Sequence, residues 1–212
     1  MTTARTAVKG LYAVTPDSAD TAALLATTRL AVAGGARLVQ YRNKTADAAL
    51  RRAQATALLE LCNQEGALLI VNDHVELAAE IGAHGAHIGR EDGALAAARR
   101  LLGPHKLIGV SCYREMERAR AAVDGGADYI AFGSFFASTV KPGAVRAPLS
   151  LLAEARTFGL PVVAIGGITP DNAATLIEAG ADALAVITAL YSAPDVAAAA
   201  QRFRQLFETH RP

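Results

Sequence analysis

Three polar side chains alternate along one short apolar stretch, RLVQYRNK at residues 37–44. Gln40, Arg42 and Lys44 occupy every second position, so on an extended strand all three project from the same face. On a solvent face this would be an ordinary half-exposed strand. On the inner face of a barrel, an amide and two cations would line one pocket, which is a set of groups suited to an anionic ligand.

Two isolated carboxylates follow other apolar runs of the chain. Asp73 ends the run ALLIVND, and Asp92 lies in the segment GRED that follows GAHIG. Mg²⁺ typically takes one or two protein carboxylates and completes its shell with water and substrate phosphate. We therefore expect Asp73 and Asp92 to bind Mg²⁺, and Arg42, Lys44 and Lys141 to bind a diphosphate. The alternative is that these charged residues form ion pairs on the surface.

Small residues close two later apolar runs and indicate a second anion site. Gly167 ends PVVAIGG, and Ile187 and Thr188 lie near the end of ALAVITA. Barrels of parallel strands often bind a phosphate with the loops that follow strands 7 and 8. The backbone N–H groups of these three residues are the predicted donors, although a tight turn would explain the paired glycines equally well.

Apolar runs of strand length alternate with alanine-rich helical stretches along the whole chain. A helical example is 47–66, and several helical stretches close with glycine. The predicted strands are 10–16, 37–43, 67–73, 85–89, 106–112, 128–134, 161–167 and 183–189. Eight such units predict an α/β protein with one domain over residues 1–212, a (β/α)8 TIM barrel, in which functional groups gather at the carboxyl ends of the strands. A doubly wound open sheet usually has five or six strands and is the weaker alternative.

Composition limits the classes of partner. The chain has 212 residues, 52% of them hydrophobic, and a formal net charge of +1. This charge provides no broad basic field for nucleic acid or an anionic membrane. The two cysteines lack metal-ligand spacing, and no apolar run approaches the length of a membrane span. We expect a cytoplasmic protein that binds neither nucleic acid nor membrane.

Other polar residues have a structural interpretation. His84 and His87 lie at a turn–strand junction and are predicted to be structural, and Cys112 is predicted to pack in the core behind Ser111. Tyr12 either flanks an aromatic substrate or fills space.

Seven motifs, taken in order and spacing, resemble those of the thiamine phosphate synthase (thiamine-phosphate pyrophosphorylase) family. They run from the second predicted strand to the eighth and are VQYRNK, IVNDH, IGRED, GVSCY, FGSFFASTVK, AIGGIT and AVITAL. The family joins hydroxymethylpyrimidine diphosphate to a hydroxyethylthiazole phosphate, giving thiamine phosphate and diphosphate. The resemblance implies this activity, a Mg²⁺ cofactor, small-molecule substrates and a homodimer.

The resemblance also implies roles for single residues. Catalysis would fall to Arg42, Lys44, Ser111 and Lys141, and the Mg²⁺ ligands would be Asp73 and Asp92. The pyrimidine diphosphate would be held by Gln40, Arg42, Lys44, Asn72, Ser111 and Lys141, with Tyr41 and Asn43 of the same motif also in the substrate site. The thiazole phosphate would be held by Ser138, Thr139, Val140, Gly167, Ile187 and Thr188. The segment ASTVKPGAVRA, which carries Lys141, is the predicted lid.

Three positions depart from the family pattern. Val140 replaces a hydroxyl residue, Arg90 replaces a glutamine, and Thr188 stands where serine is common. These changes affect side-chain contacts to the thiazole phosphate more than the predicted activity. Alternative functions are a thiazole tautomerase-like protein, another phosphate-binding barrel such as a sugar-phosphate isomerase or epimerase, and a regulatory barrel that binds without turnover.

Overall fold

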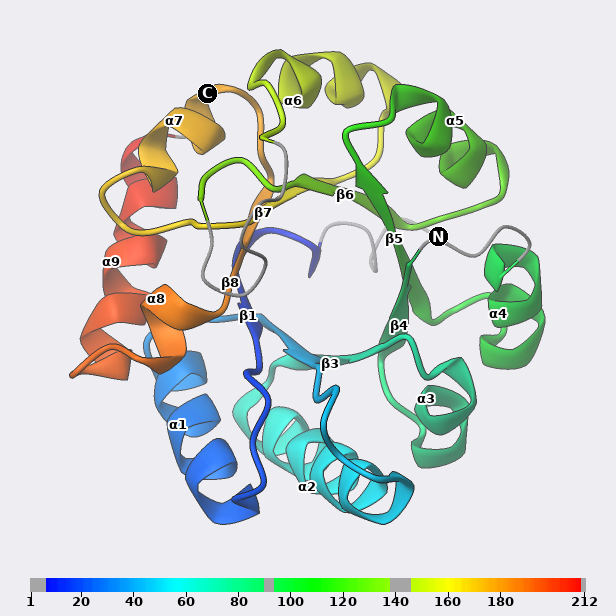
Figure 1. Ribbon diagram of the computed structural model, residues 1–212, viewed down its shortest axis with the longest axis vertical. Coiled ribbons are helices and arrows are strands. Elements are labelled where there is room, and N and C mark those ends of the chain that lie inside the picture. The colour runs from blue at the N-terminus through cyan, green and yellow to red at the C-terminus, as the bar shows by residue number, and fades with distance from the viewer. Residues whose placement is uncertain (1–6, 90–93, 138–145, 211–212) are drawn as a thin grey trace.

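The protein folds as a closed barrel of eight parallel strands. The computed structural model describes residues 7–89, 94–137 and 146–210. Neighbouring strands in the sequence pair with one another, and β8 pairs with β1 to complete the ring (Figure 1). The strands are β1 (Gly10–Val14), β2 (Leu38–Tyr41), β3 (Leu68–Asn72), β4 (Gly85–Ile88), β5 (Leu107–Tyr113), β6 (Tyr129–Gly133), β7 (Val162–Ile165) and β8 (Ala183–Val186). The predicted (β/α)8 architecture is thus confirmed.

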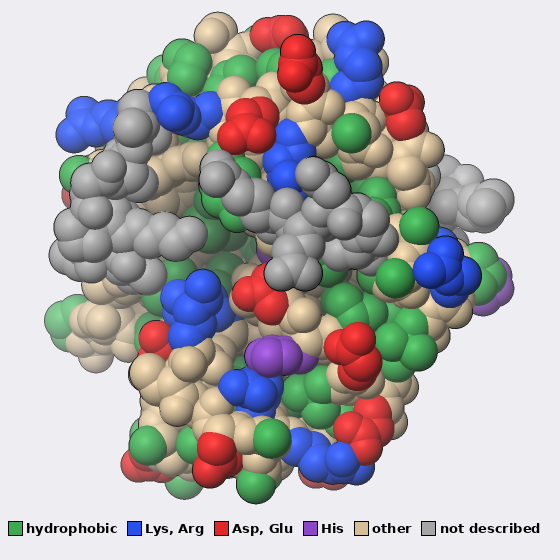
Figure 2. All heavy atoms as spheres, turned by 45° about the vertical axis from the view of Figure 1, so that its right-hand side comes forward, with side chains coloured by type: hydrophobic (Ala, Val, Ile, Leu, Met, Phe, Trp, Pro, Cys, Tyr) green, Lys and Arg blue, Asp and Glu red, His purple; other side chains and the backbone are tan. Residues whose placement is uncertain are grey.

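Helices surround the barrel and bury its outer surface (Figure 1). They are α1 (Thr21–Ala33), α2 (Ala48–Glu65), α3 (Val75–Ile81), α4 (Ala94–Leu102), α5 (Met116–Asp124), α6 (Ser150–Ala155), α7 (Ala173–Glu178), α8 (Thr188–Tyr191) and α9 (Val196–Thr209). Within the described residues, no helix is both long and apolar enough to cross a membrane. On the face shown in Figure 2, acidic and basic side chains are interspersed, which agrees with the net charge of +1.

The ends of α2 show how local sequence sets an element. The Asp47 side chain accepts a hydrogen bond of 2.8 Å from the Leu50 N–H and caps the first turn. Gly66 ends the helix with a left-handed φ of +69°, a conformation that glycine adopts without the penalty of a Cβ atom. The helix therefore lies inside the predicted range of 47–66.

Alternation along the strands separates the barrel interior from the helix-facing layer. One buried cluster, which includes Tyr12, Leu38, Ile70, Tyr129 and Val163, fills the interior. Outward residues such as Val39 and Tyr41 belong to a different cluster that packs on the helices. On β2, Gln40 therefore points inward and Tyr41 points outward.

The eighth strand is shorter than predicted. The expected range was 183–189, but β8 ends at Val186 and α8 begins at Thr188. Ile187, with φ −110° and ψ −86°, turns the chain out of the strand. An apolar run alone does not reveal such a turn, because the same residues suit a strand and a buried helix.

Candidate active site

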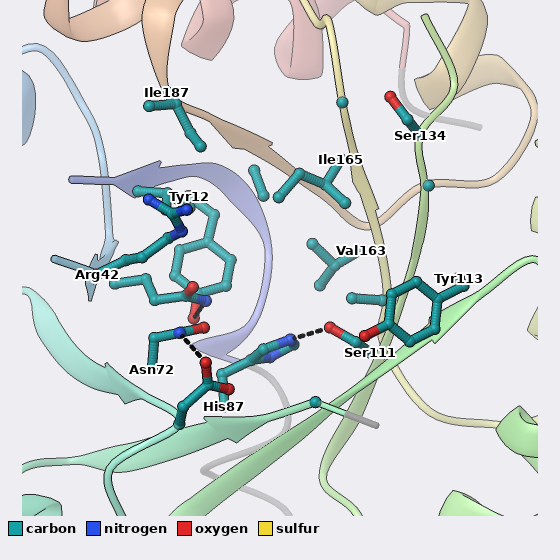
Figure 3. Close-up of a pocket in the computed structure, with 18 of the residues that line it drawn as sticks. Tyr12, Arg42, Asn72, His87, Ser111, Tyr113, Ser134, Val163, Ile165 and Ile187 are labelled. Carbon is teal, nitrogen blue, oxygen red and sulfur yellow. Dashed lines mark hydrogen bonds between the residues drawn. The ribbon is translucent and has the colours of Figure 1, made fainter. Parts of the chain in front are cut away.

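A cavity of about 1140 Å³ opens at the carboxyl ends of the strands. It brings together these predicted residues: Gln40, Arg42, Lys44, Asn72, Asp73, Ser111, Gly167, Ile187 and Thr188. Apolar side chains, among them Val163 and Ile165 of β7, line the cavity on the same side as Ser111, as Figure 3 shows. Five further predicted residues lie outside the described part of the chain: Asp92, Ser138, Thr139, Val140 and Lys141. Most of the predicted lid, residues 138–145, also lies outside it.

Asp17 holds the Arg42 guanidinium and the Lys44 backbone in the segment that follows β2. Its Oδ1 accepts a hydrogen bond from Arg42 Nη1 at 3.1 Å and another from the Lys44 backbone N–H at 2.7 Å. The buried Thr15 hydroxyl accepts from the Arg42 N–H at 2.8 Å and donates to its carbonyl at 2.9 Å. The loop is thus held before any ligand arrives. Thr15 and Asp17 carried no prediction from sequence, because both belong to a different strand–helix connection.

Tyr41 and Asn43 do not line this cavity among the described residues, but they line a second pocket of about 330 Å³ together with Lys44, Asn72 and Asp73. The Tyr41 hydroxyl donates to Gln54 Oε1 at 2.9 Å, and Asn43 Nδ2 donates to the same oxygen at 3.0 Å. Asn43 Oδ1 also accepts from the backbone N–H groups of Thr45 and Ala46. These two side chains hold the loop between β2 and α2, and their place in the substrate site stays a prediction.

Asp73 meets the requirements of a metal ligand. It follows β3 with φ +61°, a left-handed conformation that a short polar side chain tolerates. Asn72 Nδ2 donates to its Oδ2 at 2.8 Å, while Oδ1 makes no hydrogen bond with the described residues. No group of three or more His, Cys, Asp or Glu side chains converges within the described ranges. A hard cation that needs one or two carboxylates fits this donor set better than zinc does.

His87 is a cavity residue that the sequence analysis assigned to structure alone. Its Nε2 lies 2.8 Å from Ser111 Oγ (Figure 3). Its Nδ1 lies 3.0 Å from the Tyr129 hydroxyl. Burial lowers the pKa of His87 to about 4, because the imidazolium would lose its hydration. His84, by contrast, only accepts from the Leu69 N–H at 3.0 Å. His87 lies two residues after Gly85 on β4, so both residues project to the interior of the barrel. This alternation was the signal in the sequence that could have placed His87 in the cavity.

The low pKa of His87 predicts a pH effect on stability. The unfolded chain takes up a proton here near pH 6.5, whereas the folded chain does so only near pH 4. Stability is therefore complete above about 6.5 and falls as the pH drops toward 4, by about 3 kcal/mol for this group. In urea unfolding at a series of pH values, we expect His87→Gln to flatten this decline. Replacing the exposed His105 by Gln is the control, and an unchanged slope in His87→Gln would contradict the assignment.

The loop after β7 packs closely against the loop after β6. Gly166 and Gly167 have φ of +104° and +65°. A Cβ atom on Gly166 would overlap the Ser134 side chain, and one on Gly167 would overlap the Ala137 carbonyl oxygen and lie 2.8 Å from the Phe136 carbonyl carbon. Glycine is therefore required on both counts, backbone conformation and space.

A closed (β/α)8 barrel with cations, a carboxylate and glycine turns at one mouth is an arrangement typical of phosphate-binding barrel proteins. The family model described as thiamine monophosphate synthase matches residues 11–190. The chain is 57% identical over 194 residues to the thiamine-phosphate synthase of Chromobacterium violaceum, covering 92% of this chain and 94% of the relative. It is 54% identical over 200 residues to that of Methylobacillus flagellatus, covering 94% and 96%.

A solved structure agrees with these sequence matches. Thiamine phosphate pyrophosphorylase from Pyrococcus furiosus superposes with a TM-score of 0.84 at 33% identity, over 96% of this chain and 97% of that chain. The chain belongs to the thiamine monophosphate synthase family, a family of transferases. The resemblance noted from the seven motifs is confirmed.

Proposed function

We propose that this chain joins hydroxymethylpyrimidine diphosphate to hydroxyethylthiazole phosphate and releases diphosphate. The observation that carries the proposal is the convergence of Arg42, Lys44, Asp73 and Ser111 on one cavity, in a member of this family. These residues come from the ends of three different strands. Surface ion pairs would not need to share a cavity, whereas a bound diphosphate needs several cations and donors at once.

The chemistry proposed is a dissociative substitution. The pyrimidine CH₂–O bond breaks, its electron pair leaves with the diphosphate, and the amino-substituted ring stabilises the resulting cation. The thiazole nitrogen then donates its lone pair to form the new C–N bond. The residues Arg42 and Lys44 stabilise the departing charge, so no protein nucleophile is required.

Mg²⁺ is the proposed cofactor, and Asp73 with Asp92 are its proposed ligands. When bound, the ion supplies positive charge beside the diphosphate oxygens, where negative charge accumulates. Asp73 suits this role because its Oδ1 is free of hydrogen bonds to the described residues, while Asn72 holds Oδ2 at 2.8 Å. Lys141 is the proposed third cation and Ser111 a proposed donor to the diphosphate.

The second phosphate, on the thiazole, is proposed to bind the opposite rim of the cavity. Gly167 lies after β7, and Ile187 and Thr188 follow β8, so the three meet at neighbouring strand ends. Ser138, Thr139 and Val140 are proposed to complete this site. Holding the thiazole there would aim its nitrogen at the pyrimidine methylene, which is a positioning effect.

We expect Gly167→Ala to raise the KM for thiazole phosphate about tenfold, because the backbone must shift to clear the Ala137 carbonyl. It should also lower the free energy of unfolding by more than the ~1–2 kcal/mol of left-handed strain alone. Gly159→Ala is the matched control: its φ is +69°, and no atom lies within 4 Å of the added Cβ. Equal effects of the two substitutions in kinetics and unfolding would contradict the assignment.

The activity is tested by mixing both heterocycles with the protein and Mg²⁺, then measuring thiamine phosphate and diphosphate together. We expect equal amounts of the two products, and none with pyrimidine diphosphate alone. Proton exchange on the thiazole without diphosphate release would instead indicate a tautomerase-like protein. Binding of both compounds without turnover would indicate a regulatory barrel.

We also propose a cytoplasmic location, as expected for a biosynthetic enzyme, and a homodimer, which the family resemblance implies. Sedimentation at micromolar concentration tests the dimer, and a monomer throughout would exclude it. Nucleic acid and membranes are not among the proposed partners, because the chain has a net charge of +1 and the surface in Figure 2 has mixed sign.

A further inference from the structure

A continuous chain of side-chain hydrogen bonds crosses the barrel interior beneath the cavity. Gln40 Nε2 donates to the Tyr12 hydroxyl at 3.0 Å, and this hydroxyl lies 2.9 Å from that of Tyr129. Tyr129 lies 3.0 Å from His87 Nδ1, and His87 Nε2 lies 2.8 Å from Ser111 Oγ. The chain thus joins five strands and links two residues of the proposed substrate site, Gln40 and Ser111.

Close packing holds the central members in place. The rings of Tyr12 and Tyr129 meet edge to face at 6.1 Å, and Tyr129 stacks on His87 at 5.6 Å. Gly109 makes room for Tyr129, since a Cβ atom there would overlap the ring. Tyr129 therefore has no space on that side in which to swing its hydroxyl away from its two partners.

The number of protons on each group fixes which partner donates in each of these hydrogen bonds. The Gln40 amide nitrogen can only donate, so the Tyr12 oxygen accepts and its one proton must go elsewhere. Among the described residues its only remaining partner is Tyr129, which then gives its own proton to His87 Nδ1. A neutral imidazole has one N–H, so it sits on Nε2 and donates to Ser111. The opposite direction would strand the Tyr12 proton in the interior, which is costly.

We propose that Tyr12 and Tyr129 are positioning residues, whose hydroxyls transmit this direction through His87 and leave the Ser111 proton free to point into the cavity. At the other end, Gln40 Oε1 makes no hydrogen bond with the described residues and is presented as an acceptor. This row of hydrogen bonds presets one donor, Ser111, and one acceptor, Gln40, for the pyrimidine diphosphate. The inference rests on the proposed function. Neither tyrosine needs to touch the substrate for this effect.

The direction is tested by ¹⁵N NMR of the histidines, which distinguishes the two imidazole tautomers without any activity. The His87 signal is assigned by its loss in His87→Gln. We expect the Nε2–H tautomer in the wild-type chain. In Gln40→Glu, measured where the carboxylate is ionised and can only accept, the direction reverses and His87 should carry its proton on Nδ1.

A double variant separates transmission along the chain from a general effect of the new charge. Gln40→Glu with Tyr129→Phe lacks the central hydroxyl, so we expect no reversal there. An Nδ1–H tautomer in the wild type, or the same tautomer in wild type and Gln40→Glu, would overturn the proposal. A reversal that survives loss of the Tyr129 hydroxyl would overturn it equally.

The kinetic consequence is tested with Tyr129→Phe, which removes only the hydroxyl. We expect kcat/KM for pyrimidine diphosphate to fall about tenfold, the usual scale for one buried hydrogen bond, with KM for thiazole phosphate unchanged. Tyr191→Phe is the matched control, because its hydroxyl bonds Thr28 at 3.2 Å between α8 and α1. If Tyr129→Phe does not fold, Tyr12→Phe replaces it. Wild-type kinetics in a folded variant would overturn the proposal. An inactive wild-type protein would count against the proposed function, and the tautomer measured by NMR would then decide the direction of the hydrogen bonds.

Discussion

Arg42→Ala is expected to lower kcat by about 10²–10³-fold, the usual cost of removing one donor from a site where charge develops. Arg42 is half-buried at the mouth of the cavity, and Asp17 already holds its guanidinium at 3.1 Å. The side chain therefore loses little conformational freedom when a diphosphate binds. Its guanidinium can hold two diphosphate oxygens at once. Steady-state kinetics with both substrates should show the loss in kcat and only a small change in KM for thiazole phosphate.

The matched control for this substitution is Arg202→Ala. Arg202 forms an ion pair with Asp171 at the same distance, 3.1 Å, but lies on exposed α9 away from the cavity. Its removal should leave both constants near wild type. A comparable rise in KM for both substrates in Arg42→Ala would show that Arg42 does not act selectively on the diphosphate. Full activity of this variant would contradict the prediction as well. Lys141→Ala should behave like Arg42→Ala.

Asp73→Asn is expected to raise the Mg²⁺ concentration for half-maximal activity about 10–100-fold. Loss of even an outer-shell partner of a metal commonly has this effect, and Asp73 is proposed to touch the ion. The amide has the same shape as the carboxylate and also tolerates the left-handed φ of +61°, so the backbone should not change. Calorimetric titration with Mg²⁺ measures the same loss without turnover.

Asp171→Asn provides the control for Asp73→Asn, because the Asp171 side chain is 84% exposed, pairs with Arg202 and is not among the described residues that line the cavity. Its Mg²⁺ titration should match that of the wild-type chain. Unchanged Mg²⁺ affinity in Asp73→Asn would remove Asp73 from the ligand set and leave the cation to be held elsewhere.

Strand periodicity was sufficient to predict the cation wall. Gln40, Arg42 and Lys44 share a face because successive residues of a strand alternate, and this holds even though β2 itself ends at Tyr41. The eight-fold alternation of strands and helices was likewise enough to predict the barrel. Both signals are local in the sequence, so a single sequence is enough to reveal them.

The hydrogen-bonded floor could not be predicted in the same way. From sequence, His87 was predicted to be structural and Tyr12 to flank a substrate or fill space, and Tyr129 carried no prediction. Their contacts join strands up to 117 positions apart in the sequence, which no local pattern reveals. Tyr41 and Asn43 were expected in the substrate site because they share a motif with Gln40, Arg42 and Lys44, and they line a smaller pocket that also includes Lys44 and Asp73. A motif marks a segment, whereas alternation decides which of its side chains face the cavity.

A crystal structure with Mg²⁺ and hydroxymethylpyrimidine diphosphate tests the central claim most directly. We expect one ion within about 2.1 Å of an Asp73 carboxylate oxygen and of a diphosphate oxygen, with Asp92 bound to it directly or through water, and Arg42 on the same diphosphate. A diphosphate bound away from β2 and β3, or an ion that contacts neither aspartate, would contradict the account.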